Sequence, residues 1–338
     1  MTSLPISEAP APAVALADIE DAARRLSGWA VLTPLLESPG LNALVGGRVL
    51  VKAEMLQRTG SFKFRGAYNA ISRIPAAARA KGVVAFSSGN HAQGVAAAAQ
   101  IMKMPAVIAM PKDAPAIKVA NTRAMGAEIV FFDREKDDRE ELGKRLVAQH
   151  GATLIPPYDH PQVIAGQGTV GLEIAAQAQA IGVKPDAVLV PCGGGGLVAG
   201  TSLAIRAKLP GTSIYSAEPA SFDDTARSLR SGHRERVAPG SKSFCDALLL
   251  PTPGVMTFAI NRATLAGGLA VSDDEVARAM EAAFTHLKLV AEPGGAVALA
   301  AVLTRKLDAR GKTVVVVMSG GNVDAATFTD ALKTAAAK

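Results

Sequence analysis

A lysine enclosed by aromatic residues is the first candidate for chemistry in this sequence. Lys63 lies between Phe62 and Phe64, directly after a Gly-Ser turn. Apolar surroundings lower the pKa of an amine, and an amine must lose its proton before it can attack a carbonyl and form a Schiff base. The same pattern also fits a surface lysine that opens an amphipathic helix, so this segment alone leaves both interpretations open.

A second segment, SSGNHAQG, carries residue types that bind anions. Ser87, Asn90 and His91 stand where a predicted strand at 83–86 leads into a predicted helix at 91–101. Hydroxyl, amide and backbone N–H groups at a helix N-terminus suit a carboxylate. The alternative is a helix cap whose polar neighbours are turned to solvent.

Four consecutive glycines, Gly193–Gly196, join a predicted strand to a predicted helix. Their backbone N–H groups and the helix dipole suit a phosphate, and an ordinary loop has no reason to bear the entropic cost of four glycines. A competing interpretation is a dinucleotide site. Gly194, Gly196 and Ala199 match the pattern GxGxxA, and Glu218 follows near the spacing of a ribose-binding acid.

Polar residues also follow the predicted strand at 314–318. Ser319 and Asn322 belong to its terminal SGGN and stand at the carboxyl edge of a sheet, where ligands usually bind. A glycine turn with a capping serine is the alternative. Glu292, in the nearby segment EPGGA, can be explained as the first-turn acid of the following helix.

Three carboxylates lie within seven residues at the end of another predicted strand: Glu218, Asp223 and Asp224. Oxygen ligands of this kind suit Mg²⁺ or Ca²⁺ more than zinc. The alternative is an acid-rich helix N-terminus. The five histidines and two cysteines show no transition-metal pattern, and no Ser-His-Asp arrangement is recognisable.

The elements that position these residues alternate along the chain. Short β-branched runs without polar alternation are typical of strands buried on both faces, and the longer Ala-rich stretches between them have helical apolar spacing. The pattern predicts an α/β protein built around parallel sheets. The predicted strands are 49–53, 83–86, 106–110, 128–132, 187–190, 213–217 and 314–318, and the predicted helices include 91–101, 115–125, 165–180, 197–208, 273–286 and 294–309.

The composition indicates a soluble globular protein of about two domains, with 338 residues, 49% of them hydrophobic. The net charge of +6 is interspersed and only 4% of residues are aromatic, so we expect no nucleic-acid partner. Two cysteines fit a reducing compartment, and we expect a cytoplasmic protein. The longest uncharged run, 187–205, contains Pro191 and the glycine run, so we expect no membrane span.

In their order along the chain, six segments resemble those of the fold type II pyridoxal-phosphate enzymes. Within that group the chain resembles the threonine/serine dehydratases and serine racemases, over about Leu16 to Phe328. The resemblance implies two open parallel-sheet α/β domains of the tryptophan synthase beta-like type, a homodimer, and a cofactor between the domains. We expect a large cofactor-binding domain of 1–59 and 156–338, with a flexible arm at 1–15, and a small domain of 60–155. The six segments are TGSFKFRGAYN, SSGNHAQG, GGGGLVAG, AEPASFDD, EPGGA and SGGNVD.

The resemblance also implies roles for individual residues. Lys63 holds the cofactor as a Schiff base and then acts as general base, and Ser319 faces the pyridine nitrogen. Because a neutral serine does not hold a full proton on that nitrogen, elimination or racemisation is favoured over transamination. The expected cofactor contacts are Lys63, Phe62, Asn90, Gly193, Gly194, Gly195, Gly196, Leu197, Ser319 and Gly320, and the expected substrate contacts are Ser87, Ser88, Asn90 and His91.

The expected reaction is β-elimination of L-threonine or L-serine to a 2-oxo acid and ammonia. Serine racemase is an alternative, because Ser88 occupies the position of the second acid/base, a catalytic role, in the racemase branch. Hydroxyaspartate dehydratase is another, and a nucleotide-binding protein without enzymatic activity is the alternative from a different class. Glu218, the Phe222 carbonyl and Asp224 match the divalent-cation site of the racemase and hydroxyaspartate branch, which implies Mg²⁺, or Ca²⁺ or Mn²⁺.

Overall fold

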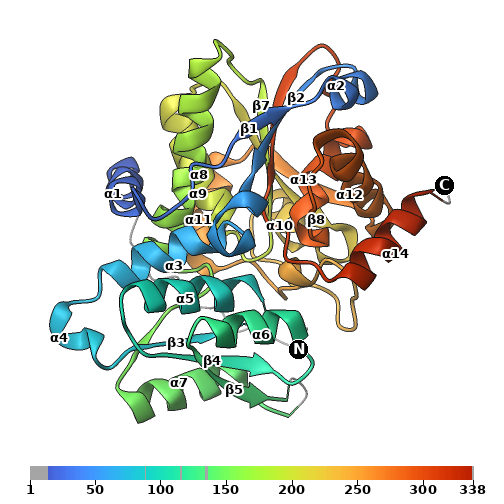
Figure 1. Ribbon diagram of the computed structural model, residues 1–338. Coiled ribbons are helices and arrows are strands. Elements are labelled where there is room, and N and C mark those ends of the chain that lie inside the picture. Colours follow the sequence, from blue (N-terminus) through green and yellow to red (C-terminus); the bar gives the residue numbers. More distant parts are fainter. Residues whose placement is uncertain (1–13, 88, 115, 134–135, 337–338) are drawn as a thin grey trace.

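The larger of two sheets forms the upper body of the molecule in Figure 1. The computed structural model describes residues 14–87, 89–114, 116–133 and 136–336. Neighbouring strands of this sheet run parallel, except that the edge strand β1 is antiparallel to β2. The strand order is β1 (Leu35–Glu37), β2 (Arg48–Ala53), β10 (Thr313–Met318), β7 (Ala187–Pro191), β8 (Ser213–Pro219) and β9 (Gly267–Val271).

The smaller sheet forms the lower body, and all its described strands come from one stretch of chain between β2 and β7 (Figure 1). Its pairs are all parallel. The two parallel-sheet bodies confirm the predicted fold class. The domain boundaries at 59/60 and 155/156 stay a prediction. The strand order is β5 (Glu128–Phe132), β4 (Ala106–Pro111), β3 (Val83–Phe86) and β6 (Thr153–Leu154).

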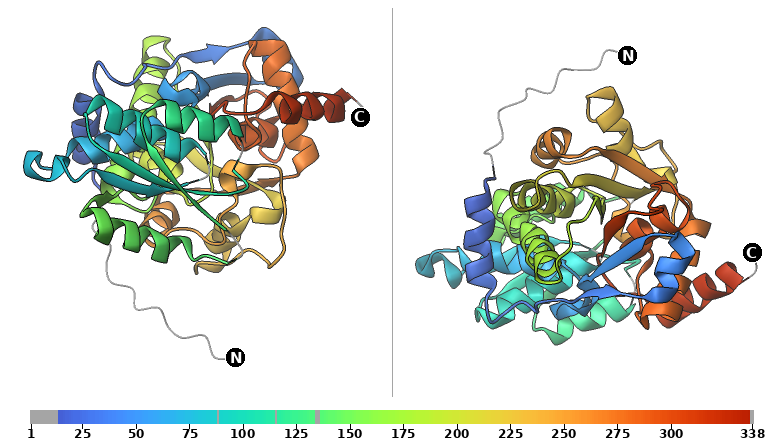
Figure 2. Two further views of the ribbon diagram at one scale, coloured as in Figure 1. Left: turned by 60° about the horizontal axis from the view of Figure 1, so that its bottom comes forward. Right: turned by 90° about the horizontal axis from the view of Figure 1, so that it is seen from above.

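Helices cover both sheets, and α1 runs beside α8 at one edge (Figure 2). The α-helices are α1 (Leu16–Leu26), α2 (Pro39–Val45), α3 (Lys63–Ser72), α4 (Ala76–Arg79), α5 (Asn90–Ile101), α6 (Ala116–Ala124), α7 (Arg139–His150), α8 (Pro161–Ala180), α9 (Gly196–Lys208), α10 (Asp224–Ser231), α11 (Val255–Thr264), α12 (Asp273–Leu287), α13 (Pro293–Leu303) and α14 (Ala325–Ala336). Short 3₁₀ helices are η1 (Glu54–Leu56), η2 (Arg58–Gly60), η3 (Ala220–Phe222) and η4 (Asp246–Leu248).

The central strand β10 shows why the strand runs lack polar alternation. Val316 belongs to a core shared with α12 and α13, whereas Val315 and Val317 belong to a core shared with α8 and α9. Successive side chains of a strand point to opposite faces, so both faces need apolar residues when helices cover both. The two helical layers therefore explain the runs of valine in the sequence.

The predicted strands are all present, as β2, β3, β4, β5, β7, β8 and β10. Three short strands, β1, β6 and β9, were not predicted. The predicted helix at 294–309 is wrong at its end, because α13 stops at Leu303 and Arg305 has a left-handed φ of 59°. The expected arm at 1–15 lies outside the described residues except for Val14 and Ala15. Within the described chain, no helix combines the length and apolarity needed to cross a bilayer.

Candidate active site

Lys63 begins α3 at the boundary between the two bodies. Its Nζ donates a hydrogen bond to the Pro157 carbonyl oxygen at 2.7 Å and lies 5.3 Å from the ring centroid of Phe62. Burial lowers the pKa of Lys63 to about 8, although the Glu292 carboxylate acts in the opposite direction. The amine therefore loses its proton more easily than an exposed lysine, which a nucleophile or general base requires.

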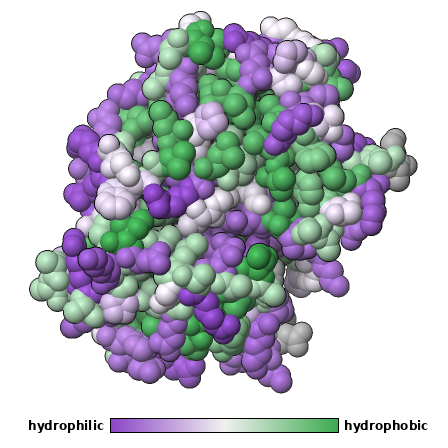
Figure 3. All heavy atoms as spheres, in the orientation of Figure 1, coloured by the Kyte–Doolittle hydropathy of each residue, from purple (hydrophilic) through white to green (hydrophobic). Residues whose placement is uncertain are grey.

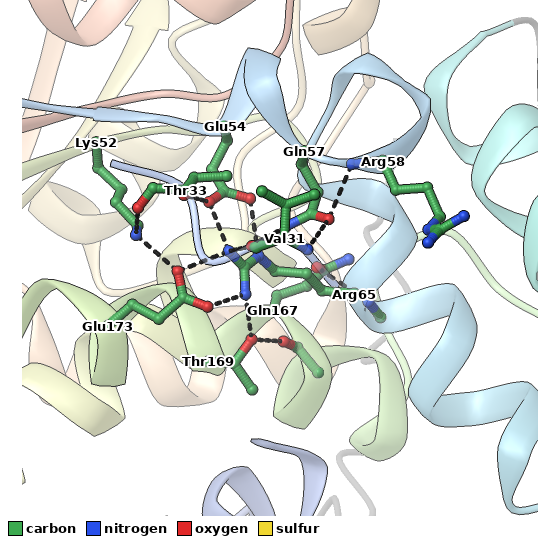
Figure 4. A network of polar contacts seen from close by, with 12 residues as sticks. Val31, Thr33, Lys52, Glu54, Gln57, Arg58, Arg65, Gln167, Thr169 and Glu173 are labelled. Atoms are coloured by element: carbon green, nitrogen blue, oxygen red, sulfur yellow. Dashed lines mark hydrogen bonds and ion pairs between the residues drawn. The ribbon is translucent and has the colours of Figure 1, made fainter. Parts of the chain in front are cut away.

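A buried ion network fixes α3 against β2 and α8 (Figure 4). Arg65 donates to Glu54 Oε2 at 2.8 Å and to Glu173 Oε1 at 2.6 Å. Lys52 donates to Glu173 Oε2 and to the Thr33 carbonyl oxygen, each at 2.6 Å. Burial alone would lower the pKa of Arg65, but the two carboxylates outweigh it and raise that pKa. The network thus holds in place the first turn of the helix that carries the candidate amine.

Asn90 begins α5 and connects the smaller body to the larger one. Its Nδ2 donates to Glu292 Oε1 at 2.5 Å, and its Oδ1 accepts a hydrogen bond from Asn322 Nδ2 at 2.8 Å. Ser87, three residues earlier, accepts a hydrogen bond from the Gly89 N–H at 3.2 Å. Ser88, the candidate second acid/base, lies outside the described residues. The amide of Asn90 is therefore held from two sides in one orientation.

His91 is buried and its ring is neutral. Nε2 lies 2.8 Å from the Ile155 carbonyl oxygen, and because a carbonyl only accepts, Nε2 carries the proton. Burial lowers the pKa of His91 to about 3, and nearby Lys63 acts in the same direction. Nδ1 has no hydrogen-bond partner among the described residues and is an acceptor in this tautomer. The ring therefore has no N–H left to donate to a carboxylate.

The glycine run forms the turn between β7 and α9. Gly195 has a left-handed φ of +90°, and a Cβ at Gly194 would collide with the ring of Tyr158. None of the backbone N–H groups of Gly193, Gly194 and Gly195 donates to another described residue. Unpaired N–H groups before the N-terminus of a helix form an anion site. The loop therefore fits the phosphate of a cofactor.

The end of β10 runs beside the loop that precedes Lys63. The Phe62 N–H donates to the Ser319 carbonyl oxygen at 3.1 Å, and Ser61 pairs with Gly320 as an isolated bridge. Ser319 is buried at 5% exposure. This pairing brings Ser319 and Gly320 next to the candidate amine, although more than 250 residues separate them in the sequence.

A buried charged group that the sequence did not reveal completes this region. Glu292 is 1% exposed, and burial raises its pKa to about 7. Its Oε2 lies 4.0 Å from Lys118 Nζ, and Lys118 also donates to Asp246 Oδ2 at 2.5 Å. A Cβ at Gly89 would lie 3.4 Å from Lys118 Nζ, so this cation borders the SSGN turn. The sequence explained Glu292 as a helix acid and gave no signal for Lys118.

The predicted metal ligands lie between the end of β8 and the start of α10. Glu218 accepts hydrogen bonds from the N–H groups of Thr225 at 2.9 Å and Ala226 at 2.7 Å, near the start of α10. Burial, together with repulsion from Asp224, raises the pKa of Glu218 to about 8, and burial raises that of Asp224 to about 7. Among the described residues, no three His, Cys, Asp or Glu side chains come together as a metal cluster.

The position of Glu218 argues against the dinucleotide interpretation. Its side chain is fully buried, and both oxygens already accept helix N–H groups. A ribose hydroxyl would need an accessible acceptor. Glu218, the acid that this interpretation needs, is therefore not available to a ribose.

The fold and the lysine-centred site define a pyridoxal-phosphate enzyme. The family model described as "Pyridoxal-phosphate dependent enzyme" matches residues 27–320, and the chain belongs to this family. The expected family is thus confirmed.

Individual relatives narrow the class. An L-threo-3-hydroxyaspartate ammonia-lyase from Pseudomonas sp is 46% identical over 94% of this chain and 98% of its own. A solved threonine deaminase from T.th. is 44% identical, with a TM-score of 0.87 over 92% of this chain and 99% of its own. A solved serine racemase from Dictyostelium discoideum is 38% identical, with a TM-score of 0.84 and the same coverage. These relatives support a lyase that uses pyridoxal phosphate, as the sequence predicts.

Proposed function

We propose that this chain is an ammonia-lyase whose preferred substrate is a β-hydroxy amino acid with a second carboxylate, namely L-threo-3-hydroxyaspartate. The observation that carries the proposal is Lys118. Its ammonium is buried beside the turn that leads into α5, where the α-carboxylate of a substrate would bind. L-threonine and L-serine need no second cation, whereas a β-carboxylate does. Relatives from Pseudomonas sp and Saccharomyces cerevisiae are named for this substrate.

The partners of Lys118 are compatible with substrate binding. Asp246 is 44% exposed at its side chain, whereas Lys118 is 5% exposed at its own. A dicarboxylate that enters the site would replace an exposed partner of a buried cation. The exposed aspartate regains its hydration when it is released, so the exchange costs less than displacing the buried Glu292 would.

Each remaining residue of the site has a physical task. The N-terminal N–H groups of α5, including that of His91, bind the α-carboxylate together with Ser87 and Ser88. Asn90, held in one orientation by Glu292 and Asn322, would contact the cofactor ring. Gly193, Gly194, Gly195, Gly196 and Leu197 would hold the phosphate, and Phe62, Ser319 and Gly320 would contact the ring of the cofactor.

Lys63 moves the proton. Bound pyridoxal phosphate supplies an electron sink for the charge that develops at Cα. Nζ of Lys63 removes the Cα proton as general base, and its lowered pKa makes the neutral amine available near neutral pH. The Pro157 carbonyl gives the free amine a defined position at 2.7 Å. The β-hydroxyl would leave with a proton as water, and the resulting enamine would tautomerise to an imine that takes up one water to give the 2-oxo acid and ammonia.

The test is release of 2-oxo acid from L-threo-3-hydroxyaspartate, L-threonine and L-serine. We expect Lys118→Met to lower kcat/KM for hydroxyaspartate by about tenfold to a hundredfold, with little change for serine, because only the former loses an ion pair. Lys118→Arg keeps the cation and should retain most of the preference. Lys112→Met removes an exposed lysine nearby and serves as control. Equal losses for all three substrates would contradict the proposal.

L-threonine and L-serine remain the second candidate substrates, because a relative from Thermotoga maritima is named L-threonine ammonia-lyase at 42% identity. Racemase activity is a further candidate, since relatives from Schizosaccharomyces pombe and Arabidopsis thaliana are named serine racemase. Chiral analysis of serine after incubation with Ser88→Ala distinguishes them. If D-serine forms at the parental rate, Ser88 is not the second acid/base.

We also infer a divalent cation, Mg²⁺ or Ca²⁺ or Mn²⁺, bound by Glu218, the Phe222 carbonyl and Asp224. Two buried carboxylates repel each other there, and Asp224 Oδ2 has no hydrogen-bond partner among the described residues. A bound cation would offset the repulsion between the carboxylates and give Asp224 Oδ2 a partner. Mg²⁺ should raise the unfolding temperature of the parent and not of Asp224→Asn. An equal shift in both would overturn the assignment.

We propose that the chain forms a homodimer through the face around β1 and β2, where Figure 3 shows apolar side chains gathered. Leu32 is 67% exposed, and Trp29, Val31, Leu56 and Val290 are 42–47% exposed. The segment 29–31 is bound to Gln57 and Arg58 by hydrogen bonds, which brings its exposed side chains close to that of Leu56. Exposed apolar patches of this kind mark interfaces. Leu32→Glu should yield a monomer by light scattering.

A further inference from the structure

We propose that Asp159 is a positioning residue for the cofactor-phosphate loop and that it acts through helix α11. Asp159 belongs to the segment by which the chain returns from the smaller sheet to the larger one. The proposal rests on the proposed role of Gly193–Gly196 in binding the phosphate. Neither Asp159 nor α11 belongs to the motifs that define the site.

The first step is the contact between Asp159 and the N-terminus of α11. The two carboxylate oxygens accept hydrogen bonds from the backbone N–H groups of Val255 and Met256, each at 2.9 Å, and of Thr257 at 3.0 Å. These N–H groups have no partner inside the helix, and a carboxylate at this end is also favoured by the helix dipole. A Cβ at Gly254 would lie 2.5 Å from Asp159 Oδ1, so the approach requires glycine there. Asp159 therefore fixes where α11 begins.

The second step is the contact between α11 and the loop. Thr257 Oγ1 donates to the Gly194 carbonyl oxygen at 2.6 Å, and the Gly254 N–H donates to the same oxygen at 3.3 Å. In a trans peptide the C=O and the following N–H point in opposite directions. Holding the Gly194 carbonyl toward α11 therefore turns the Gly195 N–H away from α11, where it can meet an anion.

A second side chain of α11 supports the same loop one turn later. Asn261 is fully buried, and a Cβ at Gly195 would lie 2.8 Å from its Nδ2. Neither polar atom of its amide has a hydrogen-bond partner among the described residues. Helix α11 thus contacts two successive glycines of the loop, through Thr257 and through Asn261.

The residues next to Asp159 connect it to the rest of the site. The Pro157 carbonyl accepts the hydrogen bond from Lys63 Nζ. A Cβ at Gly194 would collide with the ring of Tyr158, and a Cβ at Gly196 would lie 3.1 Å from the backbone and Cβ of the same residue. Three consecutive residues of one segment therefore contact the candidate amine, the loop, and the helix that holds the loop. The segment therefore links Lys63, which would bind the cofactor at its aldehyde, to the glycine loop, which would bind its phosphate.

The test compares pyridoxal phosphate with pyridoxal, which lacks the phosphate. Apoprotein is titrated with each compound, and the dissociation constants are obtained from the change in absorbance. We expect Thr257→Val, which keeps the shape of the side chain, to weaken the binding of pyridoxal phosphate about threefold to tenfold. Asp159→Ala should weaken it about tenfold or more. Pyridoxal affinity should stay unchanged in both, and the ³¹P resonance of the bound phosphate should shift.

Two variants calibrate the experiment. Thr304→Val removes a similar hydroxyl-to-carbonyl bond, to Ala300, at the end of α13, and it should leave both affinities unchanged. Asp159→Asn keeps one acceptor oxygen and should fall between the parent and Asp159→Ala. Thermal unfolding of each apoprotein shows that the variants fold.

The outcomes separate this proposal from the assignment of the loop. Gly195→Ala strains a residue with φ of +90° and should weaken pyridoxal phosphate but not pyridoxal. If it does not, the phosphate loop itself is wrongly assigned. Suppose that Gly195→Ala does weaken the binding of pyridoxal phosphate alone. If Thr257→Val and Asp159→Ala then leave the preference for the phosphate unchanged, or lower the affinity for both compounds equally, Asp159 and α11 have no role in positioning the loop.

Discussion

Two buried polar regions meet at the start of α3, and they differ in how far opposite charges offset the effect of burial on the pKa values of their side chains. Beneath the helix, Arg65 lies between Glu54 and Glu173, and these carboxylates raise its pKa in spite of its burial. At the candidate active site, burial shifts the pKa of Lys63 to about 8 and that of Glu292 to about 7. The same desolvation acts in both regions, but only the first supplies enough opposite charge at hydrogen-bond distance. The first region can stabilise the fold, and the second can exchange protons.

The largest expected effect is the loss of catalysis at the candidate active site. Lys63→Ala should lower 2-oxo acid release by about a thousandfold or more, because both the attachment of the cofactor and the general base are lost. Borohydride should no longer fix the cofactor to the protein. The free energy of unfolding of the apoprotein should not fall, since the variant removes a desolvated amine. Retained turnover would contradict the role of Lys63.

The second largest effect should be a lower free energy of unfolding when the ion network beneath α3 is broken. Arg65→Met leaves the buried Glu54 and its neighbour Glu173 without their main partner, which typically costs about 3–5 kcal/mol. Urea unfolding of the apoprotein measures the change. Arg73→Met breaks an exposed pair with Asp21 and should cost about 1 kcal/mol or less. Equal losses in the two variants would show that the network adds nothing beyond a surface pair.

Glu292 offers a smaller effect that depends on pH. Its pKa in the folded protein, about 7, lies above the ordinary value of 4.5, so the unfolded chain releases this proton more readily. The contribution of Glu292 to the free energy of unfolding is therefore fully present below about pH 4.5. It falls as the pH rises to 7, by up to about 3 kcal/mol. Glu292→Gln removes this loss and keeps an acceptor for Asn90.

Urea unfolding of the apoprotein at pH 5 and pH 8 tests this expectation. The parent should lose more stability than Glu292→Gln between the two pH values. An identical loss would mean that Glu292 stays ionised throughout, and the contrast between the two regions would then rest on Lys63 alone.

The sequence was sufficient for the parts of the molecule that depend on local pattern. The strand runs, the glycine loop and the aromatic residues around Lys63 are continuous signals of a few residues, and each appears where it was predicted. The short strands β1 and β9 gave no comparable signal, because pairing with a longer neighbour decides their conformation. The early end of α13 depends on one left-handed residue, Arg305.

The sequence could not reveal contacts between side chains that are far apart along the chain. Asn90 and Glu292 are 202 residues apart, and Lys118 and Asp246 are 128 residues apart. In the sequence, a single lysine or acid within a helix segment gives the same pattern whether its side chain is exposed to solvent or contacts a buried partner. The charges that surround the candidate amine therefore became visible only when the two bodies were placed together.

The chain passes between the sheets twice, once between β2 and β3 and once between β6 and β7. The hydrogen bond from Lys63 to Pro157 ties these two passages together. Rotation of the smaller body about the line through these two passages would keep both of them intact. The same rotation would have to break the hydrogen bonds that join Asn90 to Glu292 and Lys118 to Asp246.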